Sequence, residues 1–249
     1  NYYCNAEIMS FILIQFFLIL SVLFGGLVVS YLKTNYKTHT IKLTLAFSGG
    51  FLLAIVFCHL LPDLYQHNFE TTGFFILLGF LVQLILEYFS GGIEHGHTHS
   101  NAGLRIPLTL FLALSIHSII EGFPLGNIQG DHETHIGHGH GSLFWGILFH
   151  QIPVAIALMS LFVDSKMGMR KSWLYLSIFA LTTPLGAVIG LYVNPKDIGL
   201  DVHVILAIVV GMFLHISTTI IFETSENHRI NFLKLICILF GGGLAMFIA

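Results

Sequence analysis

Two ionisable side chains, His117 and Glu121, lie inside an apolar run that is long enough to cross a membrane. On a helix of about 3.6 residues per turn, positions i and i+4 share one face, so both side chains point the same way. A neutral imidazole and an ionised carboxylate so placed can bind one divalent cation through nitrogen and oxygen. Ionisable groups at membrane depth are costly to insert and therefore indicate function. The alternative is a polar pair that hydrogen-bonds to neighbouring helices, and this pair alone favours neither.

The next apolar run also contains a histidine. His150 lies inside that run as His117 lies inside its own, and Pro153 follows it. Proline removes a backbone hydrogen bond inside a helix, so Pro153, Pro124 and Pro184 each predict a kink or break. Broken helices at membrane depth are tolerated where the backbone lines a cavity or is buried in protein.

The elements that must position these residues are membrane-spanning. Of the 249 residues, 55% are hydrophobic and only 9% are charged, whereas a soluble domain carries about a quarter charged residues. The chain is therefore expected to be an integral membrane protein. A net charge of -3 gives no reason to expect nucleic acid, and three cysteines form no disulfide framework.

Apolar runs of spanning length, about 20 residues each, can be drawn eight times. The runs are continuous and show no alternation of period two, so helices are predicted rather than strands. We therefore expect an all-α fold in a single transmembrane domain, 1–249, with spans at 8–31, 41–62, 72–90, 104–127, 142–163, 172–193, 201–222 and 231–248.

The loop charges predict the orientation. If the N-terminus faces outside, nine of the ten Lys and Arg residues lie on the inner side and only Lys196 lies outside. Cytoplasmic loops of membrane proteins carry an excess of Lys and Arg. Both termini are therefore predicted to face outside.

Other polar residues in the spans carry weaker signals. His59 and Asp63 are again i and i+4, near the outer end of the second span, where a metal entrance and an ordinary interfacial pair are equally favoured. Glu87 is predicted to be an interfacial carboxylate near the inner surface. His215 is predicted to be a packing residue that a neighbouring helix satisfies.

Two histidine-containing loops, 91–103 and 128–141, flank the fourth span. Their histidines alternate with glycine and other small residues, a composition typical of metal-binding segments. We favour weak, dynamic capture of metal over a solvated loop or a pH-sensitive patch. The histidines concerned are His95, His97, His99, His132, His135, His138 and His140.

Four motifs in this order resemble the ZIP (Zrt/Irt-like) family of divalent-metal transporters over nearly the whole chain. The resemblance implies a 3+2+3 arrangement with an inverted repeat, in which helices 4 and 5 are central. It implies a mid-membrane transport site made by His117, Glu121 and His150, alternating access by an elevator-like or rocking movement, and often a homodimer. The motifs are Gly49–Leu52 with His59–Asp63, then His117–Gly122, His150–Pro153 and Thr183–Gly186.

Departures from the family pattern argue against a second metal. Many members bind two ions with an acidic residue at the second position of the fifth-helix motif and Glu or His at the fifth, where this chain has Gln151 and Val154. Thr183 and Ser118 likewise replace stronger ligands. We therefore expect one ion, with Gln151, Ser118, water or a backbone carbonyl as its fourth ligand.

The function expected from this set is transport of a divalent cation, most simply zinc uptake toward the cytosol across the plasma membrane. Imidazole and carboxylate ligands also suit Fe²⁺, Mn²⁺, Co²⁺ and Cd²⁺. Protons compete with metal for such ligands, so uptake should fall in acid.

The alternatives are a metal sensor and an intramembrane zinc hydrolase. A hydrolase would need a base besides its ligands, yet HExxH is absent and no second buried carboxylate is expected near His117, so the chain is predicted not to be an enzyme.

Overall fold

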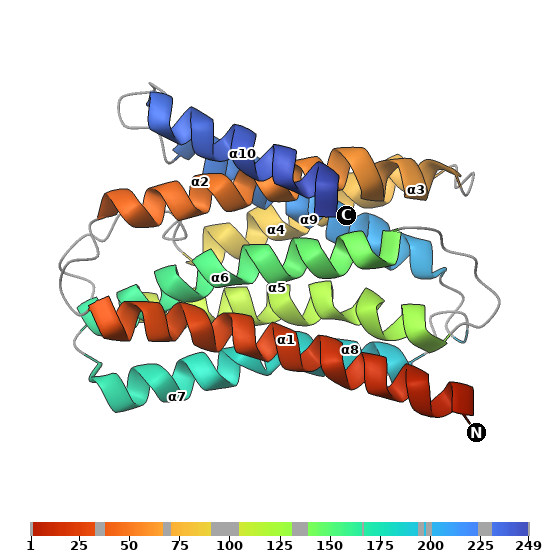
Figure 1. Ribbon diagram of the computed structural model, residues 1–249, viewed down its shortest axis with the longest axis horizontal. Coiled ribbons are helices and arrows are strands. Elements are labelled where there is room, and N and C mark those ends of the chain that lie inside the picture. The colour runs from red at the N-terminus through yellow and green to blue at the C-terminus, as the bar shows by residue number, and fades with distance from the viewer. Residues whose placement is uncertain are drawn as a thin grey trace.

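The protein is a bundle of helices that run along one common axis (Figure 1). The computed structural model describes residues 2–32, 38–66, 71–90, 105–130, 139–165, 167–193, 197, 201–223 and 231–248, and these contain helices and no strand. Helices are the expected solution for such apolar segments because, in lipid, every backbone polar group must be bonded within its own segment.

Each predicted span corresponds to a helical segment within a few residues. Within the described residues, seven segments are long and apolar enough to cross a membrane, whereas α10 is shorter, with 17 residues. The elements are α1 (Tyr2–Leu32), α2 (Thr38–Ile55), a π-helical segment η1 (Val56–Leu60), α3 (Leu61–Gln66), α4 (Thr72–Ser90), α5 (Arg105–Gly130), α6 (Gly139–Asp164), α7 (Met169–Ala180), α8 (Thr182–Tyr192), α9 (Val202–Glu223) and α10 (Phe232–Ile248).

Only one of the three predicted proline breaks divides a helix. Pro124 and Pro153 lie inside α5 and α6, which continue past them. Pro184 lies in the first turn of α8, just after the division at Leu181. It cannot donate a hydrogen bond to the carbonyl four residues back, so the chain begins a new helix there.

The second histidine-containing loop is shorter than predicted. Helix α5 extends to Gly130 and α6 begins at Gly139, so His140 belongs to the first turn of α6. The remaining histidines of both loops lie outside the described residues: His95, His97, His99, His132, His135 and His138.

Helix packing divides the bundle into two groups, which we call the α5 group (α1, α5, α6, α7 and α8) and the α9 group (α2, η1, α3, α4, α9 and α10). The closest pairs are α5 with α8, α1 with α6, α2 with α10 and α4 with α9. In Figure 1, α1, α7 and α8 lie along one side, α2 and α10 lie along the other, and α5 and α6 lie between them. These two helices form the border, because α6 contacts α2 and α5 contacts α4 and α9.

Glycines explain why helices within a group approach so closely. A Cβ added at Gly126 would lie 1.9 Å from the Ala187 carbonyl oxygen, and one added at Gly79 would lie 1.9 Å from the Ile208 carbonyl oxygen. Small residues let helix backbones touch in a membrane. All the described glycines that meet a neighbouring backbone within 3 Å do so inside one group: Gly25, Gly50, Gly79, Gly122, Gly126, Gly186, Gly190, Gly211 and Gly241.

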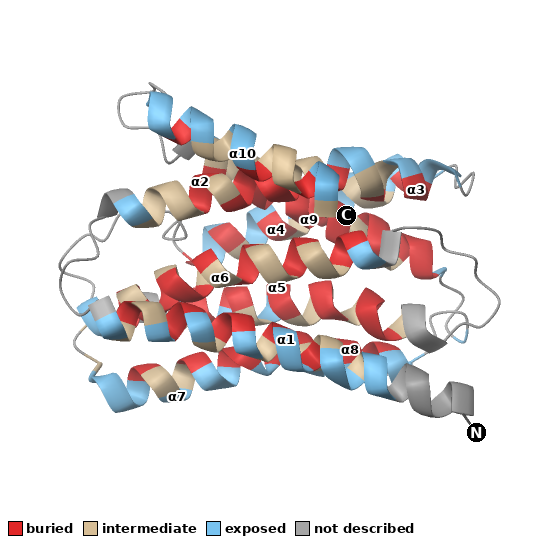
Figure 2. Ribbon diagram, in the orientation of Figure 1, coloured by how far each residue is buried: buried red, intermediate tan, exposed pale blue. Residues whose placement is uncertain are grey.

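The outer faces are apolar, as lipid contact requires. Figure 2 shows buried residues along the interior and exposed ones on the outer faces of α1, α7 and α10. Large apolar side chains on these faces are open, among them Phe16, Leu174 and Phe240. Exposed apolar surface of this extent is rare on soluble proteins and is typical of a multi-pass membrane protein.

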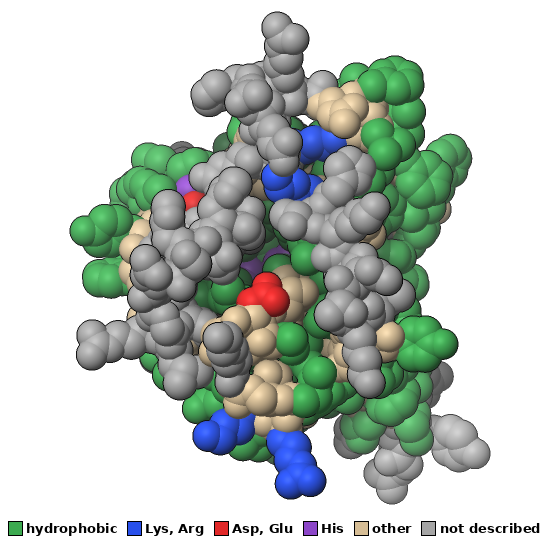
Figure 3. Space-filling model, turned by 90° about the vertical axis from the view of Figure 1, so that its left-hand side faces the viewer, with side chains coloured by type: hydrophobic (Ala, Val, Ile, Leu, Met, Phe, Trp, Pro, Cys, Tyr) green, Lys and Arg blue, Asp and Glu red, His purple; other side chains and the backbone are tan. Residues whose placement is uncertain are grey.

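Basic side chains gather at the end of the bundle where α2, α7 and α10 begin (Figure 3). The described ones there are Lys42, Arg170, Lys171 and Lys234. The same view shows a recess near the centre of this end, with histidine side chains at its bottom.

Candidate metal centre

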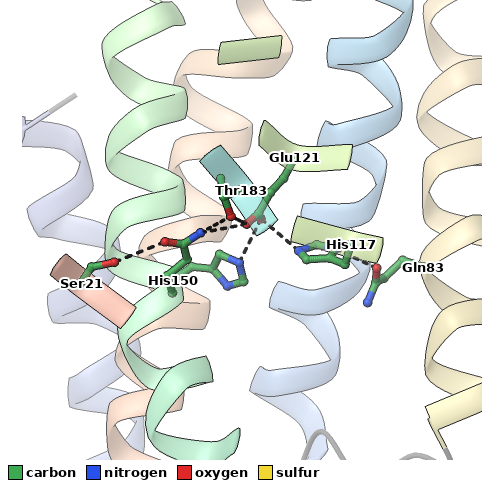
Figure 4. A network of polar contacts seen from close by, with 7 residues as sticks. Ser21, Gln83, His117, Glu121, His150 and Thr183 are labelled. Atoms are coloured by element: carbon green, nitrogen blue, oxygen red, sulfur yellow. Dashed lines mark hydrogen bonds and ion pairs between the residues drawn. The ribbon is translucent and has the colours of Figure 1, made fainter. Parts of the chain in front are cut away.

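Three buried side chains that could bind a metal ion converge at the border between the two helix groups (Figure 4). Helix α5 supplies His117 and Glu121, and α6 supplies His150; their exposed fractions are 1%, 0% and 2%. Glu121 Oε2 lies 3.0 Å from His117 Nε2 and 3.2 Å from His150 Nε2. The ligand atoms all lie within 4.8 Å of one another, and no other such group of three occurs in the described part of the chain.

These distances suit one small cation. A tetrahedral zinc site with bonds of about 2.0 Å separates its ligand atoms by about 3.3 Å. The two separations measured from Glu121 Oε2, 3.0 and 3.2 Å, are close to that value. The i, i+4 spacing predicted from the sequence therefore does place His117 and Glu121 against each other, and the packing of α6 on α5 brings His150 to the same oxygen.

The hydrogen bond on the far side of His117 determines which nitrogen faces the site. Nδ1 of His117 lies 2.9 Å from Gln83 Oε1, which can only accept, so Nδ1 carries the proton. In the neutral ring, Nε2 is then unprotonated and carries a lone pair. It lies 3.0 Å from Glu121 Oε2 without hydrogen-bonding geometry. Two acceptors so close repel each other, and a cation between them turns this repulsion into attraction.

The second oxygen of Glu121 is occupied by donors. Glu121 Oε1 accepts hydrogen bonds from Gln151 Nε2 at 3.2 Å and from Thr183 Oγ1 at 3.3 Å. Gln151 Nε2 also donates to Thr183 Oγ1 at 2.6 Å, while Gln151 Oε1 accepts from Ser21 at 3.3 Å. Gln151 therefore presents N–H groups to the carboxylate, and its possible ligand oxygen points toward α1.

The other candidate for the fourth ligand is Ser118. It is buried on α5 next to His117, but successive helical residues point about 100° apart, so its side chain is not on the face that His117 and Glu121 share. The role of either Ser118 or Gln151 as a direct ligand stays a prediction.

The predicted entrance pair lies in an irregular part of the second span. His59 belongs to the π-helical segment η1, and Asp63 is buried in the α3 turn that follows. A π-helix bonds i to i+5, so residues four apart do not stack as they do in an α-helix. His59 Nε2 is enclosed without a hydrogen-bond partner in the described structure. π-bulges are frequent at functional sites, and the entrance role stays a prediction.

Glu87 corrects the sequence analysis. It was expected to be a simple interfacial carboxylate, but it is buried between α4 and α9 and hydrogen-bonded to His215 Nε2. The prediction that a neighbouring helix satisfies His215 is confirmed. A second carboxylate is thus buried in the bundle, one helical turn from Gln83, but it pairs with His215 and does not join the group of His117, Glu121 and His150. Glu87 reaches His215 and not the metal ligands, so it does not supply the base a hydrolase needs.

Sequence reasoning also missed Gln83. It is fully buried on α4, in a run otherwise treated as apolar. The signal that could have revealed it is its own i, i+4 spacing to Glu87, the same spacing that singled out His117 and Glu121.

Comparison with known proteins points in one direction. The family described as ZIP Zinc transporter matches residues 93–249. The chain is 25% identical to "Zinc transporter 3" of Arabidopsis thaliana over 181 residues, which cover 59% of this chain and 52% of that protein. It is 26% identical to "Zinc transporter ZIP9" of Micropogonias undulatus over 168 residues, covering 62% and 53%. "Zinc transporter ZIP3" of Bos taurus is 33% identical over 108 residues, covering 40% and 32%. The chain spans about half the length of the first two of these relatives.

Proposed function

The chain belongs to the ZIP zinc transporter family, and from that membership we propose that it carries divalent metal ions, zinc in particular, across a membrane. His117, Glu121 and His150 form the site through which the ion passes. The observation that supports this most strongly is the convergence of two imidazole nitrogens on one oxygen of a buried carboxylate. Family membership indicates a transporter and not an enzyme.

The site binds one ion at a time. A second ion beside the first would need Glu121 Oε1, which already accepts from Gln151 and Thr183. Val154, one turn after His150, offers no ligand atom. Two neutral imidazoles and one carboxylate leave a dication only partly neutralised, which favours release. A transport site must bind weakly enough for the ion to leave.

Movement of the two helix groups past each other exposes the site to each side in turn. Two features support this alternating access. The ligands come from α5 and α6 alone, so they can move as one unit. The close backbone contacts through glycine lie inside each group, whereas the border is built from side chains, such as Phe51 of α2 against Phe149 of α6 with ring centroids 4.7 Å apart.

Membrane proteins carry an excess of Lys and Arg on their cytoplasmic side. The end of the bundle that holds the described Lys and Arg side chains therefore faces the cytosol. Both termini then lie outside, α10 makes an eighth crossing, and uptake runs toward the cytosol. A single cysteine placed at Asp131 is labelled from outside and one at Lys166 only from inside. Labelling of both from one side would contradict this orientation.

Uptake of radioactive zinc into proteoliposomes tests the function, with iron, manganese and cadmium as competitors. Purified protein should take up zinc in a saturable way, and His117→Ala should remove most of that uptake. Uptake that does not exceed that of protein-free liposomes would overturn the proposal, and would leave a metal sensor as the simplest alternative.

A further inference from the structure

Gln83 makes a polar contact from the α9 group to the metal centre. The ligands come from the α5 group, and the opposite wall of the site comes from α4 and α9. Phe213 of α9 faces both imidazoles, with ring centroids 6.5 Å from His117 and 5.9 Å from His150. Gln83 of α4 adds the hydrogen bond to His117 Nδ1, at 2.9 Å (Figure 4).

We infer that Gln83 is a positioning residue for the transported ion, and that its hydrogen bond to His117 forms in only one arrangement of the two helix groups. It fixes the His117 tautomer and holds the ring so that Nε2 faces Glu121. This inference rests on the proposed function, since it concerns the affinity and movement of the same site.

The cost of burying Gln83 supports a specific role. Its exposed fraction is 0%, and its Nε2 has no hydrogen-bond partner among the described residues. A buried amide with an unpaired N–H is unfavourable, and a leucine would fill the same space without that penalty. The bond to His117 is the interaction that Gln83 gains in return.

The chemistry of the acceptor sets the strength of the ligand. Histidines that bind metals usually donate their second N–H to a carboxylate, a carbonyl or water, which orients the ring and raises its basicity. An amide oxygen is neutral and accepts more weakly than a carboxylate. Gln83 therefore orients His117 while leaving it a moderate ligand, as suits an ion that must be released.

The position of the Gln83–His117 hydrogen bond links the affinity for zinc to the movement of the two helix groups. His117 belongs to the α5 group and Gln83 to the α9 group, so the bond crosses the border along which the groups are proposed to move. A hydrogen bond tolerates a change of only a few tenths of an ångström, from about 2.9 to about 3.2 Å. A larger displacement separates Gln83 from His117, which frees the ring to turn and weakens the site as it opens to the other side.

Equilibrium zinc binding to the purified full chain tests the positioning role. Zinc binding is measured with and without the Glu121→Gln change, and the difference is taken as binding at the metal centre. Zinc bound by the histidine-containing loops is the same in both measurements and cancels. Gln83→Leu should weaken binding at the metal centre about tenfold to a hundredfold, the usual effect of losing such a partner. Gln15→Leu is the matched control: it removes another buried amide, on α1, whose nitrogen and oxygen have no described hydrogen-bond partner. It should leave the binding unchanged.

A conservative variant separates positioning from packing. Gln83→Glu keeps an acceptor at His117 and strengthens it, so zinc should bind at least as tightly as in the unmodified protein. In uptake assays Gln83→Glu should lower both KM and the maximal rate, because the ion and the bond between the groups are both released more slowly. Gln83→Leu should raise KM and leave the maximal rate largely intact.

Two results would overturn the inference alone: normal zinc affinity in Gln83→Leu, or weaker binding in Gln83→Glu than in the unmodified protein. The second can be measured even if the leucine variant does not fold. Absence of any Glu121-dependent zinc binding in the unmodified protein would instead overturn the proposed function together with the inference.

Discussion

Two buried clusters of histidine and carboxylate lie in this bundle, and they differ in how many imidazoles meet one carboxylate. The pair of Glu87 and His215 joins α4 to α9 inside one helix group and contains one imidazole and one carboxylate. At the metal centre two imidazoles share one carboxylate oxygen at the border between groups. A pair of one imidazole and one carboxylate between two helices stabilises their packing, whereas three groups that can each offer a ligand atom within 4.8 Å of one another could hold a cation.

The surroundings of the two clusters reinforce the difference. His215 lies under the edge of Phe80, with ring centroids 4.7 Å apart, within the helix pair that Gly79 and Gly211 hold together. His117 is held by Gln83 across the border, and Glu121 is held by Gln151 and Thr183. We expect substitution of the first cluster to affect stability and substitution of the second to affect transport.

The largest expected effect is loss of uptake on changes at the metal centre. Glu121→Gln keeps the volume but removes the one carboxylate of the three ligands, and His117→Ala or His150→Ala removes a nitrogen ligand. Each should reduce zinc uptake by at least about tenfold, which corresponds to about 1.4 kcal/mol. Uptake into proteoliposomes, corrected for the amount of inserted protein, measures this. Near-normal uptake by Glu121→Gln would contradict the view that the metal centre serves transport while the Glu87 and His215 pair serves stability.

His215→Ala should show the opposite pattern. Removing His215 leaves the buried Glu87 carboxyl without this hydrogen-bond partner, which can cost about 1 to 3 kcal/mol. We therefore expect a lower thermal unfolding temperature in detergent, with uptake per folded molecule reduced much less than in His117→Ala. If His215→Ala were folded normally and yet failed to transport, the Glu87 and His215 pair would belong to the ion pathway.

The smallest expected effect comes from the outer histidine-containing loop. Because α6 begins at Gly139, the change should spare that helix and replace only His132, His135 and His138 by serine. If the loop only raises the local metal concentration, the apparent KM for zinc should rise by about threefold to tenfold while the maximal rate stays nearly constant. Complete loss of transport with normal folding would show that the loop takes part in the transport step.

Much of the fold could be predicted because membrane-spanning helices are encoded locally. A run of apolar residues defines a helix without reference to its partners, and the third span, 72–90, was predicted with the bounds that α4 has. The division between α7 and α8 follows from Pro184. The spans 104–127 and 142–163 were drawn through Pro124 and Pro153, and α5 and α6 do continue past them. Which proline divides a helix could not be predicted, because it depends on how neighbouring helices support the freed backbone groups.

The metal centre was only partly predictable. The i, i+4 rule relates His117 to Glu121 within one helix, whereas the approach of His150 depends on tertiary packing and was expected only from family resemblance. The sequence does separate His117 from His215, because only His117 has a carboxylate, Glu121, one turn away in its own run. It does not reveal the partner of each histidine across the helix interface, which is Gln83 for His117 and Glu87 for His215.

The most direct test of the single-site account is the location of the bound metal. Crystals or cryo-preserved samples grown with zinc should show, in an anomalous or metal-specific density map, one ion inside the bundle. It should lie about 2.0 to 2.2 Å from His117 Nε2, His150 Nε2 and Glu121 Oε2. A second ion beside it near Gln151 and Thr183, or an ion at Glu87 and His215 with none at His117, would contradict the account.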